Sequence, residues 1–292
     1  MSTLKRLRVR APVCAALCAG AVYAPAAYGQ QPQHELTELI NAYRTSPQQC
    51  SDRKTDPAGP LAPDARLSRV EVGPGARGSP AEALQRAGYS AARVQFIVVT
   101  GPQNAESAMS VLRKQYCSVL LDRSFADVGV SQDGRTWRVV FAQPLLSPNL
   151  GDWREAGKAV LSLVNAARAE PRTCGDRKFA AAGTVTWDSR LADAALGHSR
   201  GMAEHNYFAH RAKDGSEVAQ RASRQGYHWR RVGENIAMGQ GSPDQVMRGW
   251  LASPHHCANI MAPGFTEMGA AFAVNPQSDA TIYWTQVFGT PR

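Results

Sequence analysis

Apolar residues recur with a helical period near the start of each half of this 292-residue chain. The spacing i, i+3, i+4, i+7 places them on one face of a helix. The first set is Leu36, Leu39, Ile40 and Tyr43, and the second is Val160, Leu163, Val164 and Ala167. The second set predicts a helix over residues 153–169, which ends before Pro171 because proline cannot continue a helix.

The rest of the C-terminal half alternates between predicted helices and short strands. Alternating apolar residues and β-branched residues predict strands over residues 184–187, 230–238, 268–274 and 281–288. Helices are predicted over residues 191–205, 216–224 and 243–252; the last begins after Ser242 and ends at Pro254. Helices that flank a small sheet indicate the α+β class.

The two halves share an internal repeat. Residues 41–54 read NAYRTSPQQCSDRK and residues 165–178 read NAARAEPRTCGDRK, with 8 of 14 positions identical at a constant offset of 124. Further matches follow at an offset of 138 for Gly88 and Tyr89, and at 140 for Cys117. Two copies of well over a hundred residues indicate a duplicated domain rather than a solenoid. We expect one domain over residues 30–147 and the other over residues 153–292.

The first copy lacks part of what the second contains. The change of offset from 124 to 138 means that about fourteen residues are missing from it. In the second copy this segment carries three histidines, His198, His205 and His210. Phe96 stands in the place of Glu234, and residues 66–78 are expected to form a loop. We therefore interpret the first copy as degenerate and without a polar site.

The first 29 residues have the pattern of a secretory signal peptide. Four basic residues precede an apolar run over residues 11–24, and residues 27–29 form a small-x-small site, so we expect cleavage before Gln30. The alternative is an uncleaved anchor, which the shortness of the run disfavours. No later stretch of the sequence is long and apolar enough for a membrane span. The expected location is secreted or periplasmic.

The charge of the chain changes this picture little. Four of the nine net positive charges lie in the leader, which leaves +5 for the remainder. These charges are spread without a Lys/Arg run, so nucleic-acid binding has no motif behind it.

Four cysteines remain after the leader, namely Cys50, Cys117, Cys174 and Cys257. An even number in an exported chain predicts two disulfides, for which three pairings are possible. The repeat favours Cys50–Cys117 and Cys174–Cys257, because each pair occupies equivalent positions in its copy. A pairing across the two halves would break this correspondence.

One ordered set of motifs marks the C-terminal half. It consists of His210, Gly-Glu-Asn at 233–235, SPHHCANIM at 253–261 and YWTQVFG at 283–289. In this order and spacing, the segment from about Lys158 to Gly289 resembles bacterial SCP-like members of the CAP superfamily. That superfamily takes in the cysteine-rich secretory, antigen 5 and plant pathogenesis-related 1 proteins. The resemblance implies an α-β-α sandwich with a central, mainly antiparallel sheet. Together with the internal repeat, this predicts two tandem copies of that fold, of which the first is degenerate.

The resemblance also implies a cavity lined by His210 and Glu234. We expect His256 to point into the same cavity and Tyr283 to form part of its wall. In animal members a second acid and a second histidine complete the set. Here Tyr283 stands where that histidine would be, and Ser253, followed by His256, stands near the place of the acid. The chemistry of the animal members is therefore not implied.

His210, Glu234 and His256 are a candidate zinc site. Two histidines and one carboxylate are ligands that zinc accepts with one coordination position left open. The strong helical motif His-Glu-x-x-His is absent. The alternative is that the three side chains form a hydrogen-bonded polar cluster without a metal.

Several other residues are expected to have structural roles. His198 and His205 lie seven residues apart on one helical face and could face the site, but we expect them at the surface or at a helix end. Arg221 is expected in an ion pair. Trp250 and Phe265 are expected in the core, as large aromatic residues usually are.

Three functions are compatible with these residues. The first is an exported, non-catalytic binding module for an envelope or extracellular ligand, which could be a lipid, a glycan or a protein. The alternative is a metal-assisted hydrolase that acts on peptide or cell-envelope polymer, with Glu234 as ligand or general base. A purely structural envelope protein is a third possibility. The sequence contains no Gly-x-Ser-x-Gly motif, and the expected disulfides leave no free thiol. Ligand, substrate and oligomeric state stay open, since fold does not fix function.

Overall fold

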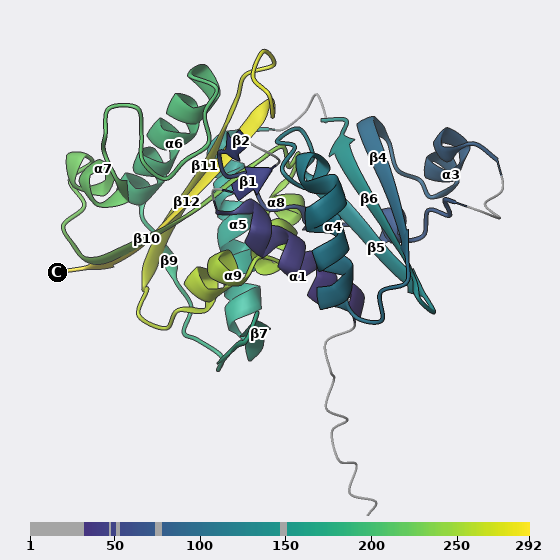
Figure 1. The fold of residues 1–292 in the computed structure, drawn as a ribbon. Coiled ribbons are helices and arrows are strands. Elements are labelled where there is room, and N and C mark those ends of the chain that lie inside the picture. The colour runs from purple at the N-terminus through teal and green to yellow at the C-terminus, as the bar shows by residue number, and fades with distance from the viewer. Residues whose placement is uncertain (1–31, 47, 51–52, 74–77, 147–150) are drawn as a thin grey trace, which may run out of the picture.

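The computed structural model describes residues 32–46, 48–50, 53–73, 78–146 and 151–292. The expected signal peptide and its cleavage site lie outside these residues. We refer to residues 32–146 as the N-terminal half and to residues 151–292 as the C-terminal half (Figure 1). None of the helices in the described ranges is long and apolar enough to traverse a bilayer.

The C-terminal half is built on a sheet with the strand order β10-β12-β11-β9. The strands are β9 (Thr186–Trp187), β10 (Trp229–Met238), β11 (Glu267–Val274) and β12 (Ile282–Pro291). β12 pairs antiparallel with β10 and β11, and the short β9 runs parallel to β11. The sheet is thus mainly antiparallel, as expected, and β10 lies at one edge.

Helices cover both faces of this sheet. They are α5 (Trp153–Arg168), α6 (Ser189–Glu204), α7 (Val218–Arg224), α8 (Pro243–Leu251) and α9 (Pro254–Met261). Trp284 of β12 belongs to the same apolar cluster as Val160 and Trp250, whereas Val287 packs with Leu191. Because neighbouring side chains of a strand point to opposite faces, α5, α8 and α9 cover one face and α6 and α7 the other (Figure 1).

The N-terminal half contains a second sheet of similar arrangement, in the order β3-β5-β6-β4. Its strands are β3 (Ala62–Pro63), β4 (Ala91–Thr100), β5 (Asp127–Asp133) and β6 (Thr136–Pro144). β6 pairs antiparallel with both neighbours, and β3 runs parallel to β5. The edge strands β4 and β10 even share a register shift near their start, at residues 91–93 and 229–231. The helices of this half are α1 (Pro32–Arg44), α2 (Ala65–Ser68), α3 (Pro80–Arg86) and α4 (Ala105–Leu120).

A buried arginine at the end of the first helix of each half makes a matching set of contacts. Arg44 donates hydrogen bonds to the carbonyl oxygens of Gly59, Leu120, Asp122 and Phe125. Arg168 donates to those of Gly183, Ile260, Ala262 and Phe265. Burial lowers the pKa of both guanidinium groups, for Arg44 to about 9. The carbonyl oxygens replace the water that burial removes, so each arginine ties distant segments to its helix.

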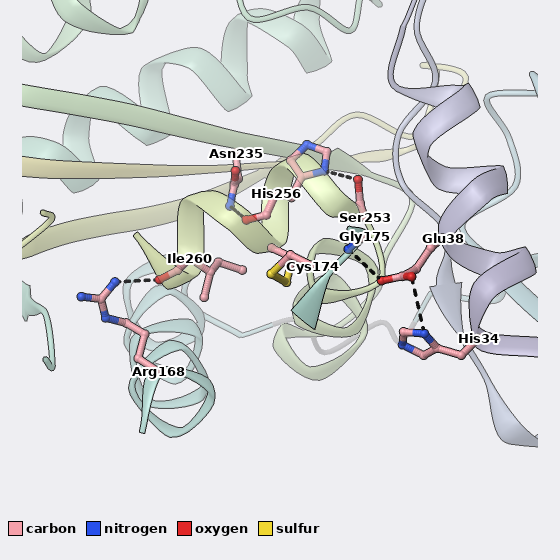
Figure 2. The surroundings of a disulfide bond; sticks show 10 residues. His34, Glu38, Arg168, Cys174, Gly175, Asn235, Ser253, His256 and Ile260 are labelled. Atoms are coloured by element: carbon pink, nitrogen blue, oxygen red, sulfur yellow. Dashed lines mark hydrogen bonds and ion pairs between the residues drawn. A yellow bond between two sulfur atoms is a disulfide. The ribbon is translucent and has the colours of Figure 1, made fainter. Parts of the chain in front are cut away.

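A two-stranded hairpin that carries a disulfide follows each of these helices. The hairpins are β1 (Gln48–Cys50) with β2 (Arg53–Thr55), and β7 (Arg172–Cys174) with β8 (Arg177–Phe179). The bonds join Cys50 to Cys117 and Cys174 to Cys257, which confirms the predicted pairing. Figure 2 shows the second bond between its hairpin and α9. With sequence separations of 67 and 83 residues, each bond restricts the unfolded chain by about 4 to 5 kcal/mol in the chain-entropy account.

Two predicted details are wrong. Pro254 does not only end a helix: it opens α9, because proline fits the first turn and Ser253 stands at the cap position. The expected loop over residues 66–78 begins within the short helix α2, whose cap Asp64 accepts a hydrogen bond from the Arg66 amide. Leu67 of this helix is fully buried.

The N-terminal half packs against the C-terminal half through buried polar contacts. Asn41 donates a hydrogen bond to the carbonyl oxygen of Ala252, just after α8. Gln240 donates in the other direction, to the carbonyl oxygens of Pro60 and Ala126. Figure 1 shows α6 and α7 on the side of the C-terminal sheet that faces away from the N-terminal half. On that side Ala58 of the N-terminal half still packs in one buried apolar cluster with Met202 and Ala203 of α6.

Candidate functional site

Glu234 is the centre of a buried polar cluster. Strand alternation points its side chain to the face that α6 and α7 cover. One carboxylate oxygen accepts a hydrogen bond from His210 Nδ1 at 2.8 Å, and the other accepts from Arg221 Nη2 at 2.5 Å. His198 Nε2 lies 3.9 Å from Glu234 Oε1. We call these four residues the Glu234 cluster.

The cluster keeps Glu234 ionised although the residue is 6% exposed. Burial acts to raise the pKa of Glu234, but the hydrogen bond from His210 and the charge of Arg221 outweigh burial. The pKa is therefore held below its ordinary value. The ion pair between Arg221 and Glu234 confirms the role predicted for Arg221.

His198 lies inside the protein rather than at the surface, contrary to our expectation. It is 2% exposed, and its Nε2 lies 2.9 Å from the Ala209 carbonyl oxygen, so Nε2 carries the proton of this bond. Burial lowers the pKa of His198 to about 4, and Glu234 offsets this only in part. The ring is neutral at pH 7. In the sequence, His198 follows the apolar Leu191 by seven residues and Ala195 by three. This helical spacing is the signal that places His198 on the buried face of α6.

His256 has a partner of its own in α9. Its Nδ1 lies 2.8 Å from the Ser253 hydroxyl, and Asn235 donates a hydrogen bond to its carbonyl oxygen (Figure 2). Asn235 follows Glu234 on β10, so α9 lies at the face opposite to the one that Glu234 points to. Burial, followed by the charge of His210, lowers the pKa of His256 to about 3. The structure thus joins His256 to Ser253, and no hydrogen bond or ion pair among the described residues joins it to Glu234.

Tyr283 lies on the α6 face, but away from the cluster. It pairs with Met238 in the sheet register, four residues along β10 from Glu234. That separation corresponds to about 13 Å along a strand. Tyr283 is fully buried, and its hydroxyl donates to Asn206 Oδ1 at 3.2 Å.

The side chains of the Glu234 cluster do not fit a zinc site. Across the described ranges, no group of three or more His, Cys, Asp or Glu side chains is arranged to hold a metal ion. The Arg221 guanidinium occupies one oxygen of Glu234, and His198 uses Nε2 for a carbonyl oxygen. Zinc would need those lone pairs free of a positively charged donor. We derive no metal-dependent step.

A surface cavity of about 310 Å³ lies beside the cluster. α6, α7 and the segment between them, residues 205–217, form its walls, to which the cluster contributes His198 and Arg221. His205, just past the end of α6, also lines the cavity. Further wall residues are Gly197, Gly201, Tyr207, Lys213, Asp214 and Arg224. The sequence did not predict this cavity, because its space depends on how α6, α7 and the segment between them fold against one another.

The equivalent place in the N-terminal half is apolar. Phe96 of β4 pairs with Val140 and packs against a cluster that includes Leu67, Val70 and Leu84. A phenylalanine in this position offers no lone pair or charge, so this place has no counterpart of Glu234.

Comparison with known proteins supports a CAP domain in the C-terminal half. Residues 161–288 match the model of the cysteine-rich secretory protein family, CAP. An uncharacterised protein of Bacillus subtilis, YkwD, is 32% identical over 101 residues, which are 35% of this chain and 37% of that protein. An uncharacterised membrane protein of the same organism, YlbC, is 28% identical over 142 residues, 46% of this chain and 38% of that protein. The chain thus spans less than two fifths of the length of these relatives.

Solved structures show a weaker likeness. An extracellular protein containing a SCP domain from Bacillus anthracis has a TM-score of 0.41 and 17% identity, covering 76% of this chain and 75% of that one. A cysteine-rich secretory protein from Staphylococcus aureus has a TM-score of 0.37 and 14% identity, covering 56% and 54%.

Proposed function

Starting from the CAP match over residues 161–288, we propose that this is an exported protein whose C-terminal half binds an envelope or extracellular ligand without converting it. The observation that carries the proposal is the state of Glu234. Both of its carboxylate oxygens are engaged, one by His210 and one by Arg221, and the group is buried.

A general base needs a free lone pair and a pKa near the working pH. Glu234 suits this role poorly, since each of its oxygens already accepts a hydrogen bond from a basic side chain and its pKa is lowered. His198 is neutral, fully enclosed and committed to the Ala209 carbonyl oxygen. These features support a role for Glu234 and His198 in holding the wall of the adjacent cavity rather than in proton transfer.

The experiment is a ligand panel with purified protein from residue 30 onward. Thermal unfolding is followed with lipid vesicles, neutral oligosaccharides and peptides, and each ligand is recovered and analysed by mass spectrometry. We expect one class to raise Tm in a concentration-dependent way, as binding to the folded state requires, and to be recovered unchanged. Conversion of a ligand by the parent but not by Glu234→Gln would contradict the proposal.

We also propose export, with cleavage before Gln30. The basic and apolar leader and two disulfides support it, because disulfides persist in oxidising compartments. N-terminal sequencing of the protein from the culture medium or periplasm is expected to begin at Gln30. A sequence that begins at Met1 in those fractions would refute this.

We further propose that residues 30–147 and 153–292 are two copies of one domain, the first degenerate. The repeat offsets, the shared strand order and the matching arginine contacts support this proposal. On this proposal the first copy kept the scaffold and lost most of the equivalent of α6.

A further inference from the structure

Asp127 is a buried carboxyl at the contact between the two halves. It is the first residue of β5, paired with Ala62 of β3 and Ala142 of β6, and its exposed fraction is 0%. Its Oδ2 accepts two hydrogen bonds, from the Tyr89 hydroxyl at 2.6 Å and from Gln245 Nε2 at 3.1 Å. Tyr89 belongs to the N-terminal half and Gln245 to α8, so the C-terminal half forms part of the cover over this carboxyl.

Close packing of the two halves seals the region around Asp127. A Cβ at Gly239 would lie 2.7 Å from the Cβ of Ala126, the neighbour of Asp127 in the chain. A Cβ at Gly249 of α8 would lie 3.4 Å from the Pro60 carbonyl oxygen. Separation of the halves would therefore remove the cover and admit water to the carboxyl.

The partners of Asp127 do not compensate for a buried negative charge. Its Oδ1 has no hydrogen-bond partner among the described residues and is shielded from solvent. Both donors to Oδ2 are uncharged, since burial raises the pKa of Tyr89 well above its ordinary value. Glu234, in contrast, is paired with a guanidinium. A buried carboxylate without such a partner is unstable relative to its protonated form.

The charged groups around Asp127 are committed elsewhere. Burial acts to raise the pKa of Asp64, but the hydrogen bonds from Arg66 outweigh it, so Asp64 is a second negative charge near this carboxyl. Arg66 is engaged by that bond, at 2.7 Å, and Arg248 of α8 donates its Nε proton to the Pro63 carbonyl oxygen at 3.2 Å. Within the described ranges, neither arginine forms a hydrogen bond or an ion pair with Asp127.

The balance of these effects favours the protonated form. Burial raises the pKa of Asp127 to about 6 from its ordinary value of 3.8, and the charge of Asp64 acts in the same direction. The hydrogen bond from Tyr89 and the charges of Arg248 and Arg66 act against it. A group with a raised folded-state pKa stabilises the folded protein below its ordinary value, and this stabilisation is lost as the pH rises through the folded-state value. Here the loss falls between about pH 4 and pH 7.

The C-terminal half contains a matching set of side chains, in which an arginine pairs with a helix cap and lies over a tyrosine ring, and the tyrosine donates to an acid. The sets are Asp64, Arg66, Tyr89 and Asp127, and Asp188, Arg190, Tyr227 and Glu267. Glu267 is partly exposed, whereas Asp127 is fully enclosed. The enclosure at the contact between the halves therefore distinguishes Asp127, and Glu267 offers a matched control.

From these observations we propose that Asp127 makes the contact between the halves pH-dependent: when its carboxyl takes up a proton, the packing of α8 against the N-terminal half becomes more stable. The proton enters the folded protein more readily than a form with separated halves, because separation returns the carboxyl to water. This device does not depend on the proposed ligand binding. It holds the halves together more firmly in a mildly acidic medium than in a neutral one.

The test combines NMR with native-state hydrogen exchange on the disulfide-intact chain from residue 30 onward. The ¹³C shift of the Asp127 carboxyl in the parent should titrate with a midpoint of about pH 6. Asp127→Asn is neutral at every pH and keeps an oxygen for the two donors. On going from pH 7.5 to pH 5.0, protection of the amides of residues 239–248 should rise about tenfold more in the parent than in this variant. The comparison cancels the contributions of other groups, such as buried histidines.

Two further variants isolate the role of Asp127. Glu267→Gln should keep the pH dependence of the parent, because Asp127 is intact. Arg248→Gln removes a positive charge of α8 and should raise the midpoint of Asp127. This second shift is measured in a chain that retains Asp127, so it decides the matter even where Asp127→Asn does not fold.

Two results would overturn the proposal. One is a midpoint of Asp127 near its ordinary value of 3.8 in the parent, which would show that the carboxyl stays charged at the contact. The other is an equal change of protection in the parent and in Asp127→Asn, which would show that the proton does not act on the packing of the halves. Neither result bears on the proposed binding function, which the ligand panel tests separately.

Discussion

At the scale of single residues, the Glu234 cluster shows how one buried carboxylate stays charged. Its oxygens find a guanidinium and an imidazole, so the energy lost on leaving water is returned within the protein. Removing one partner of such a pair typically costs about 3–5 kcal/mol, because the other charge stays buried alone. Arg221 and Glu234 are therefore mutually dependent. The sequence predicts an ion pair for Arg221 but not its partner. The partner depends on how α7 packs against β10, which the local pattern does not show.

Two buried histidines are expected to set the acid stability of the protein. The folded-state pKa is about 4 for His198 and about 3 for His256, both below the ordinary value of 6.5. The unfolded chain therefore binds more protons as the pH falls below 6.5, so stability is lost from there downward. Between pH 7.0 and 4.5 each histidine should cost roughly 2 kcal/mol of unfolding free energy.

Urea unfolding of the disulfide-intact protein at these two pH values tests this. His198→Gln and His256→Gln should each reduce the difference between the two unfolding free energies by roughly 2 kcal/mol, whatever their stability at pH 7.0. His228→Gln, at an exposed position, serves as the control. An unchanged difference in the two buried variants would show that these histidines do not titrate with folding.

At the scale of helices and strands, apolar periodicity predicts an element correctly where one face is buried and where capping residues, glycine or proline stand at its ends. The helix predicted over residues 153–169 corresponds to α5, and the predicted strands 230–238 and 268–274 correspond to β10 and β11. Pro254 was read as a stop because α8 ends before it, but the same proline begins α9. Ser253 followed by Pro254 is also a helix-start signal, which the interpretation as a stop left out.

In each half, the start of a helix lies very close to a glycine of a neighbouring strand: α6 at β11 in the C-terminal half and α2 at β5 in the N-terminal half. A Cβ at Gly269 of β11 would lie 2.1 Å from the Ala192 nitrogen of α6, and one at Gly129 of β5 would lie 2.3 Å from the Leu67 carbonyl carbon of α2. In both halves the helix start therefore presses directly on the strand backbone. In the N-terminal half it is the short helix α2 that makes this contact with the sheet.

The cavity itself could not have been predicted from the pattern. Its space depends on the absence of a side chain at Gly197 and on the course of residues 205–217, and neither is visible in apolar periodicity. His198 could have been predicted, because it lies three and seven residues after buried positions on α6. The grouping of His256 and Tyr283 with Glu234 relied on resemblance, and the structure gives each of these two a separate partner.

At the scale of the whole molecule, the two halves share buried polar contacts rather than a simple apolar seam. Gln240 of the C-terminal half reaches two carbonyl oxygens of the N-terminal half, and Gln245 donates to Asp127 at 3.1 Å. Close backbone approach accompanies these bonds, since a Cβ at Gly239 would lie 2.7 Å from that of Ala126. Buried donors and acceptors of this kind lose their partners if the halves separate. None of the residues that make these bonds lines the cavity beside α6 and α7.

We therefore expect the two halves to unfold together. Differential scanning calorimetry of the chain from residue 30 onward should show one cooperative transition. Gln240→Ala should lower the unfolding free energy by about 1–3 kcal/mol, because it leaves the buried carbonyl oxygens of Pro60 and Ala126 without this donor. Gln277→Ala, at an exposed position of the same half, should change it by less than about 0.5 kcal/mol. Two separate transitions in the parent protein, with only one of them moved by Gln240→Ala, would show that the halves are independent and that the buried bonds between them do not couple their folding.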